Sequence, residues 1–198
     1  ADPATGKFQT IDKLAIEHGK TYSVFAQLTL DITPELELSG GARYTHETKR
    51  GYLANTFSNA SVGFVPIVFP VKSVPARNTS NNLSPEVTLT YRPTDDLMVY
   101  GAFKTGYKAG GLNLSQVVTA GLTSEAASFD KEIARGFEAG IKAKLFGNRA
   151  DVQLTAYRYK YSDLQVSAYV PQLQTYVVSN AAASRNYGVE LEGRFRAT

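Results

Sequence analysis

The chain has 198 residues, of which 43% are hydrophobic and 20% are charged, and its formal net charge is +3. This composition excludes a disordered chain, and so small and dispersed a positive charge does not favour nucleic acid as a partner. The absence of cysteine excludes disulfides and thiolate metal sites. No run approaches the roughly 20 apolar residues of a spanning helix, so only a β-barrel could carry this chain through a bilayer.

The first two strands are expected at residues 21–32 and 36–48. Every second residue from position 22 is apolar, while the intervening positions are mostly polar, with Phe25 as the exception. A tight turn around Pro34 separates this strand from the next, which alternates in the same way. Such alternation predicts a hairpin of two long strands.

A stretch rich in Asn, Ser, Gly and Pro follows, and residues 49–82 are expected to form a long loop. A third strand is predicted at residues 83–91, a short turn at 92–96 and a fourth strand at 97–107. A second long loop is expected at residues 108–130.

The fifth strand is predicted at residues 132–145. Its apolar side is interrupted by Arg135, which lies close to the preceding loop and to Asp130. A long basic side chain in that place can extend its charge towards water. A turn is expected at residues 146–149.

The sixth strand is predicted to begin at residue 151. Its alternation blurs at Tyr157, Tyr159 and Tyr161, which indicates a bulge or an exit from the apolar layer. A third loop at residues 165–174 and a seventh strand at 186–196 complete the chain.

Three features favour a membrane barrel over a soluble sandwich. Several predicted strands run to a dozen residues, whereas strands of globular proteins average about 5–6. The connections alternate between short and long, as in barrels with tight turns at one end and long loops at the other. Charges of both signs on the polar side would also be costly in a dry core. The prediction is an all-β, antiparallel up-and-down meander of about seven long strands, part of a larger transmembrane β-barrel.

Four segments carry a more specific pattern. Residues 100–113 are YGAFKTGYKAGGLN, residues 137–142 are FEAGIK, residues 156–166 are AYRYKYSDLQV and residues 180–192 are NAAASRNYGVELE. In this order and at hairpin spacing, they resemble barrel motifs of TonB-dependent outer-membrane receptors. The resemblance extends over roughly residues 22–195.

The resemblance implies that residues 1–198 are a partial barrel. The family's energy-coupling box, its plug and its aromatic-ended last strand are not seen, and its barrels have about 22 strands. The implied parent lies in the bacterial outer membrane, in contact with its lipid, and is not an enzyme. It would take up a scarce solute such as a ferric siderophore, coupled to the TonB protein through a missing N-terminal region. We expect the seven strands alone to self-associate, because two long sheet edges and an apolar face are left uncovered.

No catalytic, cofactor-binding or metal-binding residue is assigned, and no cofactor is expected. His18 and His46 are isolated and resemble surface residues more than metal ligands. Glu190 and Glu192 lie two apart on one strand face, where a solvated surface is a better interpretation than an acid–base pair.

Three other patterns have ordinary explanations. Gly106, Gly110 and Gly111 lack the end of a phosphate loop and indicate a turn or a close backbone approach. Asn59 and Asn78 begin glycosylation patterns that are short enough to arise by chance. The tyrosines fit an interfacial aromatic girdle better than a surface for stacking sugars or bases.

Two alternatives to the receptor remain at this stage. The first is a secreted β-sandwich that binds carbohydrate through its tyrosines. The second, an outer-membrane barrel hydrolase, is weaker because no Ser/His/Asp arrangement can be placed in the sequence. The long loops at residues 49–82 and 108–130 are predicted to lie together at one end of the sheet and to contribute to solute capture.

Overall fold

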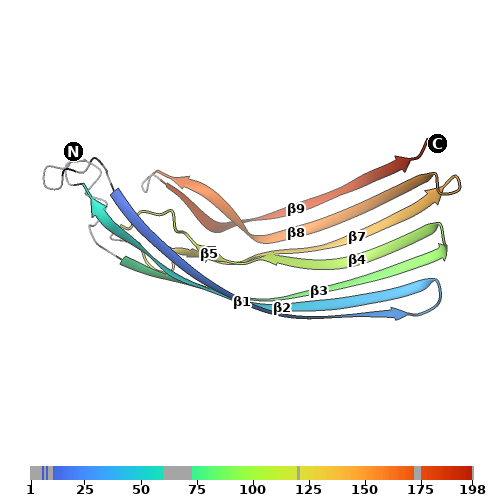
Figure 1. The fold of residues 1–198 in the computed structure, drawn as a ribbon, viewed down its shortest axis with the longest axis horizontal. Coiled ribbons are helices and arrows are strands. Elements are labelled where there is room, and N and C mark those ends of the chain that lie inside the picture. Colours follow the sequence, from blue (N-terminus) through green and yellow to red (C-terminus); the bar gives the residue numbers. More distant parts are fainter. Residues whose placement is uncertain are drawn as a thin grey trace.

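The computed structural model describes residues 6, 8, 11–59, 73–119, 121–171 and 175–197. Seven long strands form one open sheet, in which each strand pairs antiparallel with the next along the chain (Figure 1). They are β1 (Ile11–Asp31), β2 (Leu36–Ser58), β3 (Ser73–Thr94), β4 (Leu97–Lys108), β7 (Glu132–Leu145), β8 (Ala150–Val170) and β9 (Thr175–Phe195). The predicted all-β meander of seven strands is confirmed. Within these residues no helix is long and apolar enough to cross a membrane.

The strands are longer than predicted, and two predicted loops are wrong. Most of residues 49–59 and 73–82 belong to β2 and β3, which pair with one another out to Ala54 and Ser73. The expected loop at 165–174 is largely the paired end of β8 and β9. Asn, Ser and Pro have low strand propensity, but continuous pairing with a neighbouring strand overrides that preference. Residues 60–72 and 172–174 lie outside the described part of the chain.

The short turns gather at one end of the sheet (Figure 1). In the first, the Thr33 hydroxyl accepts hydrogen bonds from the backbone N–H groups of Glu35 and Leu36, at 3.3 and 3.1 Å. In the third, Gly147 has a φ of +62°, a conformation that glycine adopts without strain. The β4–β7 connection lies at the opposite end, so the predicted alternation of short and long connections holds there.

The bulge predicted among the tyrosines of the sixth strand is present. The register between β8 and β9 shifts between Tyr161 and Leu164, and Asp163 has a φ of +56°. A residue in this conformation interrupts the ladder and turns the strand. The shift marks the point beyond which β8 no longer pairs with β7.

The sheet has one apolar and one polar face, because side chains alternate along every strand. One register row on the apolar face consists of Leu30, Leu38, Leu89, Gly101, Ala139, Ala156 and Val189. Large side chains of this face are open to the surroundings, with Leu28 80% and Leu191 72% exposed. Phe25, the exception in the sequence pattern, lies on the polar face with the Arg43 guanidinium 5.1 Å from its ring centre.

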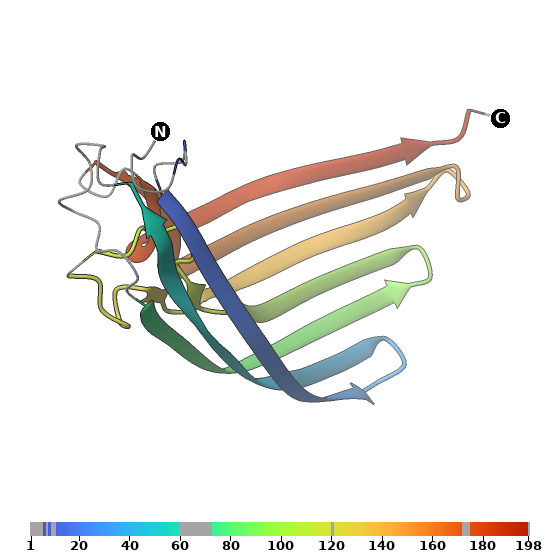
Figure 2. The ribbon, with the colours of Figure 1, turned by 60° about the vertical axis from the view of Figure 1, so that its left-hand side comes forward.

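The sheet divides towards the end opposite the turns. β3 pairs with β4 only from Glu86 onward, and β7 pairs with β8 only as far as Ser162. The outer halves of β2–β3 and β8–β9 therefore separate (Figure 2). Pro75 and Pro85 lie in β3 without disturbing its pairing with β2. The backbone nitrogen of each proline, which carries no hydrogen, therefore faces away from β2. A sheet tolerates proline in this orientation, because no ladder hydrogen bond to β2 is lost.

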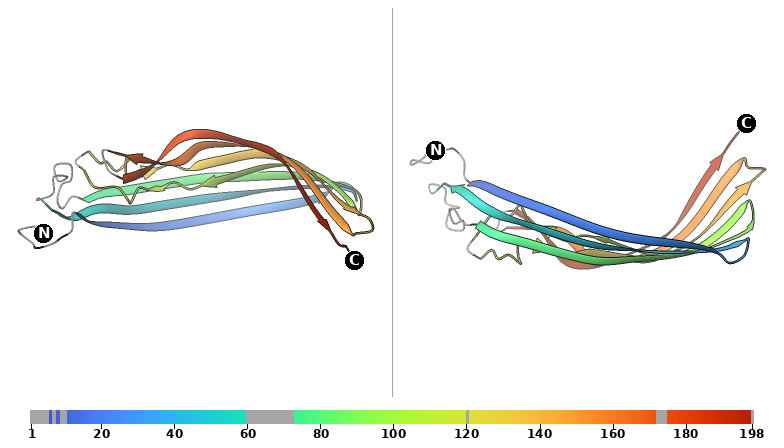
Figure 3. Two further views of the ribbon diagram at one scale, coloured as in Figure 1. Left: turned by 90° about the horizontal axis from the view of Figure 1, so that it is seen from above. Right: turned by 60° about the horizontal axis from the view of Figure 1, so that its bottom comes forward.

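The segment 109–131 lies between the two separated halves. Its short strands β5 (Gly111–Leu112) and β6 (Ser128–Phe129) form a ladder of their own, and they contact β2, β3 and β9. The long strands curve together in one sense (Figure 3). β1 and β9 are the two edges, each paired on one side only.

Candidate functional site on the polar face

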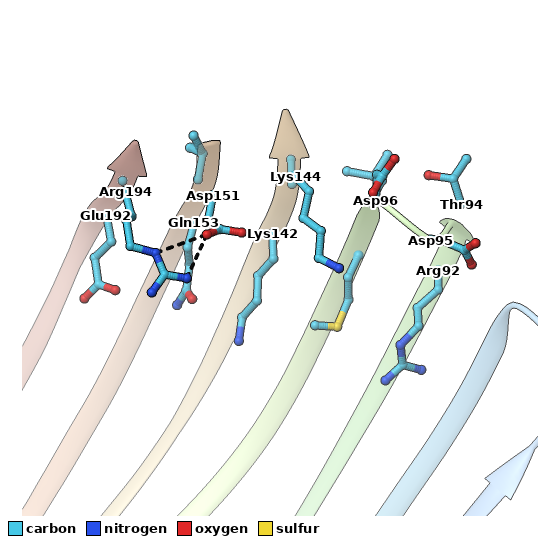
Figure 4. A pocket seen from close by; sticks show the side chains of 15 residues that line it. Arg92, Thr94, Asp95, Asp96, Lys142, Lys144, Asp151, Gln153, Glu192 and Arg194 are labelled. Carbon is cyan, nitrogen blue, oxygen red and sulfur yellow. Dashed lines mark hydrogen bonds and ion pairs between the residues drawn. The ribbon is translucent and has the colours of Figure 1, made fainter. Parts of the chain in front are cut away.

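The turn end of the polar face is an open pocket of about 530 Å³ with charges of both signs (Figure 4). β3, β4, β7, β8 and β9 contribute its side chains. Arg194 donates to the Asp151 carboxylate at 2.8 and 3.2 Å, and Arg92 pairs with Glu37 at 3.1 Å. Lys144 and Glu192 are exposed there. Such a surface is suited to contact with water or with a polar partner.

A polar network crosses three strands in the middle of the same face. The Lys104 ammonium donates to one oxygen of Glu138 at 2.7 Å, and the Tyr159 hydroxyl donates to the other at 2.5 Å. All three residues are partly buried. Because both carboxylate oxygens are bonded, this network holds β4, β7 and β8 in register.

Three tyrosines of the polar face lie directly opposite glycines of neighbouring strands. The pairs are Tyr100–Gly140, Tyr157–Gly188 and Tyr159–Gly136. A Cβ atom at these glycines would approach the tyrosine side chain to 2.6, 2.9 and 2.3 Å respectively. Each tyrosine ring thus occupies the space that a side chain on the opposite residue would need. Only glycine fits opposite the ring without a change in packing.

The segment 109–131 is anchored to β9 through two asparagines. The amide of Asn113 donates to the carbonyl of Val178 and accepts from its N–H, both at 2.9 Å. Asn180 accepts from the N–H of Asp130 at 2.7 Å and donates to its carbonyl at 2.9 Å. Each amide therefore makes the paired donor and acceptor contacts of a strand neighbour, while the short strands β5 and β6 pair only with each other among the described residues.

The other side of the segment is anchored to β2 and β3. Asn55 donates to the carbonyl of Val118 and Asn78 to that of Phe129, both at 2.9 Å. An apolar cluster lies beneath, made of Leu53, Val74, Ala76, Leu112, Val118 and Ala127. The predicted loop is therefore an ordered layer on the polar face.

One carboxyl in this layer has a shifted pKa. A hydrogen bond from its own backbone N–H, and then one from the hydroxyl of Thr123, hold the pKa of Glu125 below its ordinary value. The side chain is exposed. Glu125 therefore contributes a negative charge to the outer surface of the segment at neutral pH.

The three glycines in and before this segment were expected at a turn or at a close backbone approach, and two of them meet that expectation. A Cβ atom at Gly110 would lie 2.4 Å from the Phe129 carbonyl oxygen, and one at Gly111 would lie 2.5 Å from the Phe129 ring. The expected close backbone approach is confirmed for both. It is wrong for Gly106, where a Cβ atom would meet nothing within 4 Å.

The histidines and the two glutamates form no joint site. His46 lies 2.7 Å from the Asn81 side chain, and His18 is exposed on the same strand pair. The described residues hold no group of three or more metal-ligating His, Cys, Asp or Glu side chains. Glu190 and Glu192 are exposed on the polar face.

The glycosylation pattern at Asn78 begins at a buried side chain. Asn78 is only 7% exposed and bonded to Ser80 and Phe129, so it has a structural role. The pattern at Asn59 extends beyond the described residues.

The tyrosines are on both faces of the sheet, with Tyr22, Tyr44 and Tyr187 among those on the apolar face. An interfacial girdle therefore explains only part of them.

We expect Asn113→Ala to loosen the segment 109–131 without unfolding the sheet. The substitution leaves the Val178 N–H and carbonyl without their partners, at a cost of about 1–3 kcal/mol. Limited trypsin digestion should then cut after Lys108 or Lys131 faster than in the unchanged protein. Thr119→Ala, in the same segment, is the matched control and should digest at the original rate. Equal rates for Asn113→Ala and the control would show that this amide is not an anchor.

Comparison with known protein families matches almost the entire chain to one family. Residues 2–198 match the family described as TonB dependent receptor-like, beta-barrel. The pesticin receptor of Yersinia pestis is 26% identical over 182 residues, which cover 89% of this chain and 24% of the receptor. The pesticin receptor of Yersinia enterocolitica matches to the same extent. The chain thus spans about a quarter of the length of these curated relatives.

Solved structures show the same fold. The ferric yersiniabactin uptake receptor FyuA from Yersinia pestis matches with a TM-score of 0.75 and 23% identity, over 96% of this chain and 26% of that one. The ferric-catecholate import receptor Fiu from E. coli K12 matches with 0.64 and 18%, over 93% and 26%. The copper transporter OprC matches with 0.64 and 16%, over 93% and 28%. In each case the seven strands correspond to part of a larger chain.

Proposed function

The chain belongs to the TonB-dependent receptor β-barrel family of the bacterial outer membrane, and from this membership we propose that it forms part of the wall of a barrel that takes up a scarce solute, such as a ferric siderophore. The family is one of transporters and not of enzymes. Energy would come from TonB, which would act on a part of the receptor outside these 198 residues.

The two faces of the sheet carry this proposal. A face with Leu28 80% exposed and Leu191 72% exposed needs an apolar medium, and lipid is the medium that a barrel wall offers. The opposite face has ion pairs and an open charged pocket, as expected of a lumen filled with water or with other parts of the receptor.

The segment 109–131 is the part of this chain that we assign to solute capture. It lies on the polar face at the end opposite the short turns, where barrels of this kind carry their external loops. Its anchors hold it in one place, so a solute would meet a preformed surface. A solute surface on this segment is favoured over one at the turn end, where external loops are not expected.

The carbohydrate-binding sandwich finds no support in the fold. A sandwich buries its apolar face between two packed sheets. Here all seven long strands belong to one sheet, and the apolar face carries no second layer within the described residues. The tyrosines that would stack on sugars instead cover glycines, as Tyr100 and Tyr159 do.

Uptake by the complete receptor tests the proposal. A strain that depends on this receptor should grow under iron limitation on at least one ferric siderophore from a panel that also contains haem and copper. We expect entry of the labelled siderophore into washed cells to stop when the proton-motive force is dissipated, and Asn113→Ala to slow that entry several-fold at unchanged receptor abundance. Thr119→Ala again serves as the control.

Two results would contradict the proposal. Solute entry that continues at the same rate without an energised membrane would exclude coupled transport. Uptake unaffected by Asn113→Ala, once digestion has shown the segment to be loosened, would remove the segment 109–131 from solute capture.

A further inference from the structure

A row of three cations crosses the apolar face where hydrophobic side chains give way to polar ones. Arg135 of β7 is the register partner of Lys160 of β8, which is in turn the partner of Arg185 of β9. All three side chains are exposed. Neighbouring strands lie about 4.8 Å apart, so three positive charges are attached to adjacent strands side by side.

A fourth cation lies one row closer to the hydrophobic band. Arg158 stands between its register partners Phe137 and Tyr187. The four basic side chains border a shallow hollow of about 400 Å³, whose other lining includes Phe103 and Phe137. The hollow therefore joins positive charge on one side to aromatic surface on the other.

In the described part of the chain, the regularly paired positions of the apolar face around these cations carry no acidic side chain. The ion pairs recorded on these strands lie on the polar face. Like charges directly opposite one another on neighbouring strands destabilise a sheet, so the row gains stability when an anion binds to it.

The height of the row matches a membrane interface. Ten residues separate Arg135 from Leu145 at the turn end of β7, which is about 33 Å along the strand. At a strand tilt of about 40°, this corresponds to roughly 25 Å across the membrane, the height of the apolar band of such barrels. The cations therefore lie at the level of lipid headgroups.

We propose that Arg135, Lys160 and Arg185, with Arg158, bind the phosphate groups of an anionic lipid in the leaflet on the loop side of the membrane. The inference rests on the proposed function for the direction of the apolar face. Guanidinium groups bind phosphate through paired hydrogen bonds, and Lys160 adds a point charge between them. The acyl chains of the same lipid would lie against Phe103 and Phe137.

A lipid explains the site better than a soluble anion. A soluble phosphate would use only the charges, whereas the hollow continues directly into the hydrophobic band at Phe137 and Tyr187. Because the cations and the band form one surface, the fitting ligand carries a phosphate and hydrocarbon together.

The complete receptor, purified in detergent, allows a direct test by native mass spectrometry. The probes are hexa-acylated lipid A with both phosphates, the same lipid after dephosphorylation, and inorganic phosphate as a competitor. The variant is R135Q/K160Q/R185Q, and the control is K20Q/R50Q, which removes two cations from the same face of β1 and β2, strands that contribute nothing to the basic row. Heat-dependent gel mobility reports that each variant is folded.

The unchanged receptor and the control should bind phosphorylated lipid A in preference to the dephosphorylated lipid. The triple variant should bind the phosphorylated lipid about 100-fold more weakly, since each basic residue near an anionic membrane surface contributes about 1 kcal/mol. Equal binding of both lipids, unchanged affinity in the triple variant, or displacement of the lipid by millimolar phosphate would each overturn the inference. A receptor that binds no lipid and does not insert into vesicles would contradict the proposed function itself.

Discussion

Leu154→Arg is expected to lower the free energy of unfolding from a bilayer, and hence the stability of the barrel, by about 2–4 kcal/mol. Leu154 is on the apolar face of β8, and its register partners are Ile141 and Leu191. It lies near the middle of the stretch between Ala150 at the turn end and Lys160 of the basic row, so its side chain points to the middle of the hydrophobic band. A guanidinium there is too far from either interface to reach water without distorting the bilayer.

The neighbouring residue offers a matched control. Gln153→Arg adds the same charge one position away, on the polar face, where Gln153 lines the charged pocket (Figure 4). We expect this change to cost less than about 1 kcal/mol. Reversible urea unfolding of the complete receptor in lipid vesicles measures both variants. Equal losses for the two would show that the apolar face does not contact lipid.

Gly140→Val, a substitution on the polar face, is expected to lower the free energy of unfolding by a similar amount. A Cβ atom at Gly140 would lie 2.6 Å from a ring carbon of Tyr100 and 2.7 Å from its hydroxyl oxygen. The ring must leave its place, and the 3.1 Å hydrogen bond between the hydroxyls of Tyr100 and Thr155 is lost with it. Overpacking and the lost hydrogen bond together should cost roughly 2–4 kcal/mol.

Gly101→Val is the control for this prediction. Gly101 is adjacent to Tyr100 and faces the opposite side, where a Cβ atom would meet nothing within 4 Å. Its substitution should leave the unfolding midpoint nearly unchanged. Tyr100→Ala should remove most of the additional cost of Gly140→Val in the double variant, because the clash needs both side chains. A purely additive double variant would indicate that the glycine is required for another reason.

The sequence predicted the parts of the fold that alternation encodes. The seven strands, the turns near Pro34, Asp95 and Gly147, and the division into two faces all follow from period-two patterns. The resemblance of residues 100–113 and three later segments to receptor motifs gave the family. These features depend on nearest neighbours along the chain, which a single sequence displays directly.

The strand ends could not be predicted in the same way. Residues 73–82 contain Pro75, Asn78 and Asn82, which are typical of loops, and yet they pair with β2 throughout. The pairing partner decides the structure there, and it lies some twenty or more residues away in the sequence. Phe25 is similar, because its place on the polar face makes sense only once Arg43 is seen above it.

The candidate site was predictable in outline but not in its contacts. The sequence indicated that residues 108–130 connect two strands at the loop end, and Gly110 and Gly111 signalled a close approach. Nothing local to Asn113 signals that its amide will bind Val178, 65 residues later. The Tyr–Gly pairs were equally hidden, since each glycine and its tyrosine are on different strands.

The placement of the segment 109–131 also sets an order for assembly. Its contacts with Asn55 and Asn78 lead backwards along the chain, and its contacts with Val178 and Asn180 lead forwards. Loops that must close over such separations form late, because their entropy is lost before their contacts are gained. The segment can reach its final position only after the β8–β9 hairpin has formed. The segment can therefore dock only when both halves of the divided sheet have formed. Protection of the bonds after Lys108 and Lys131 from protease would measure the completion of this docking step.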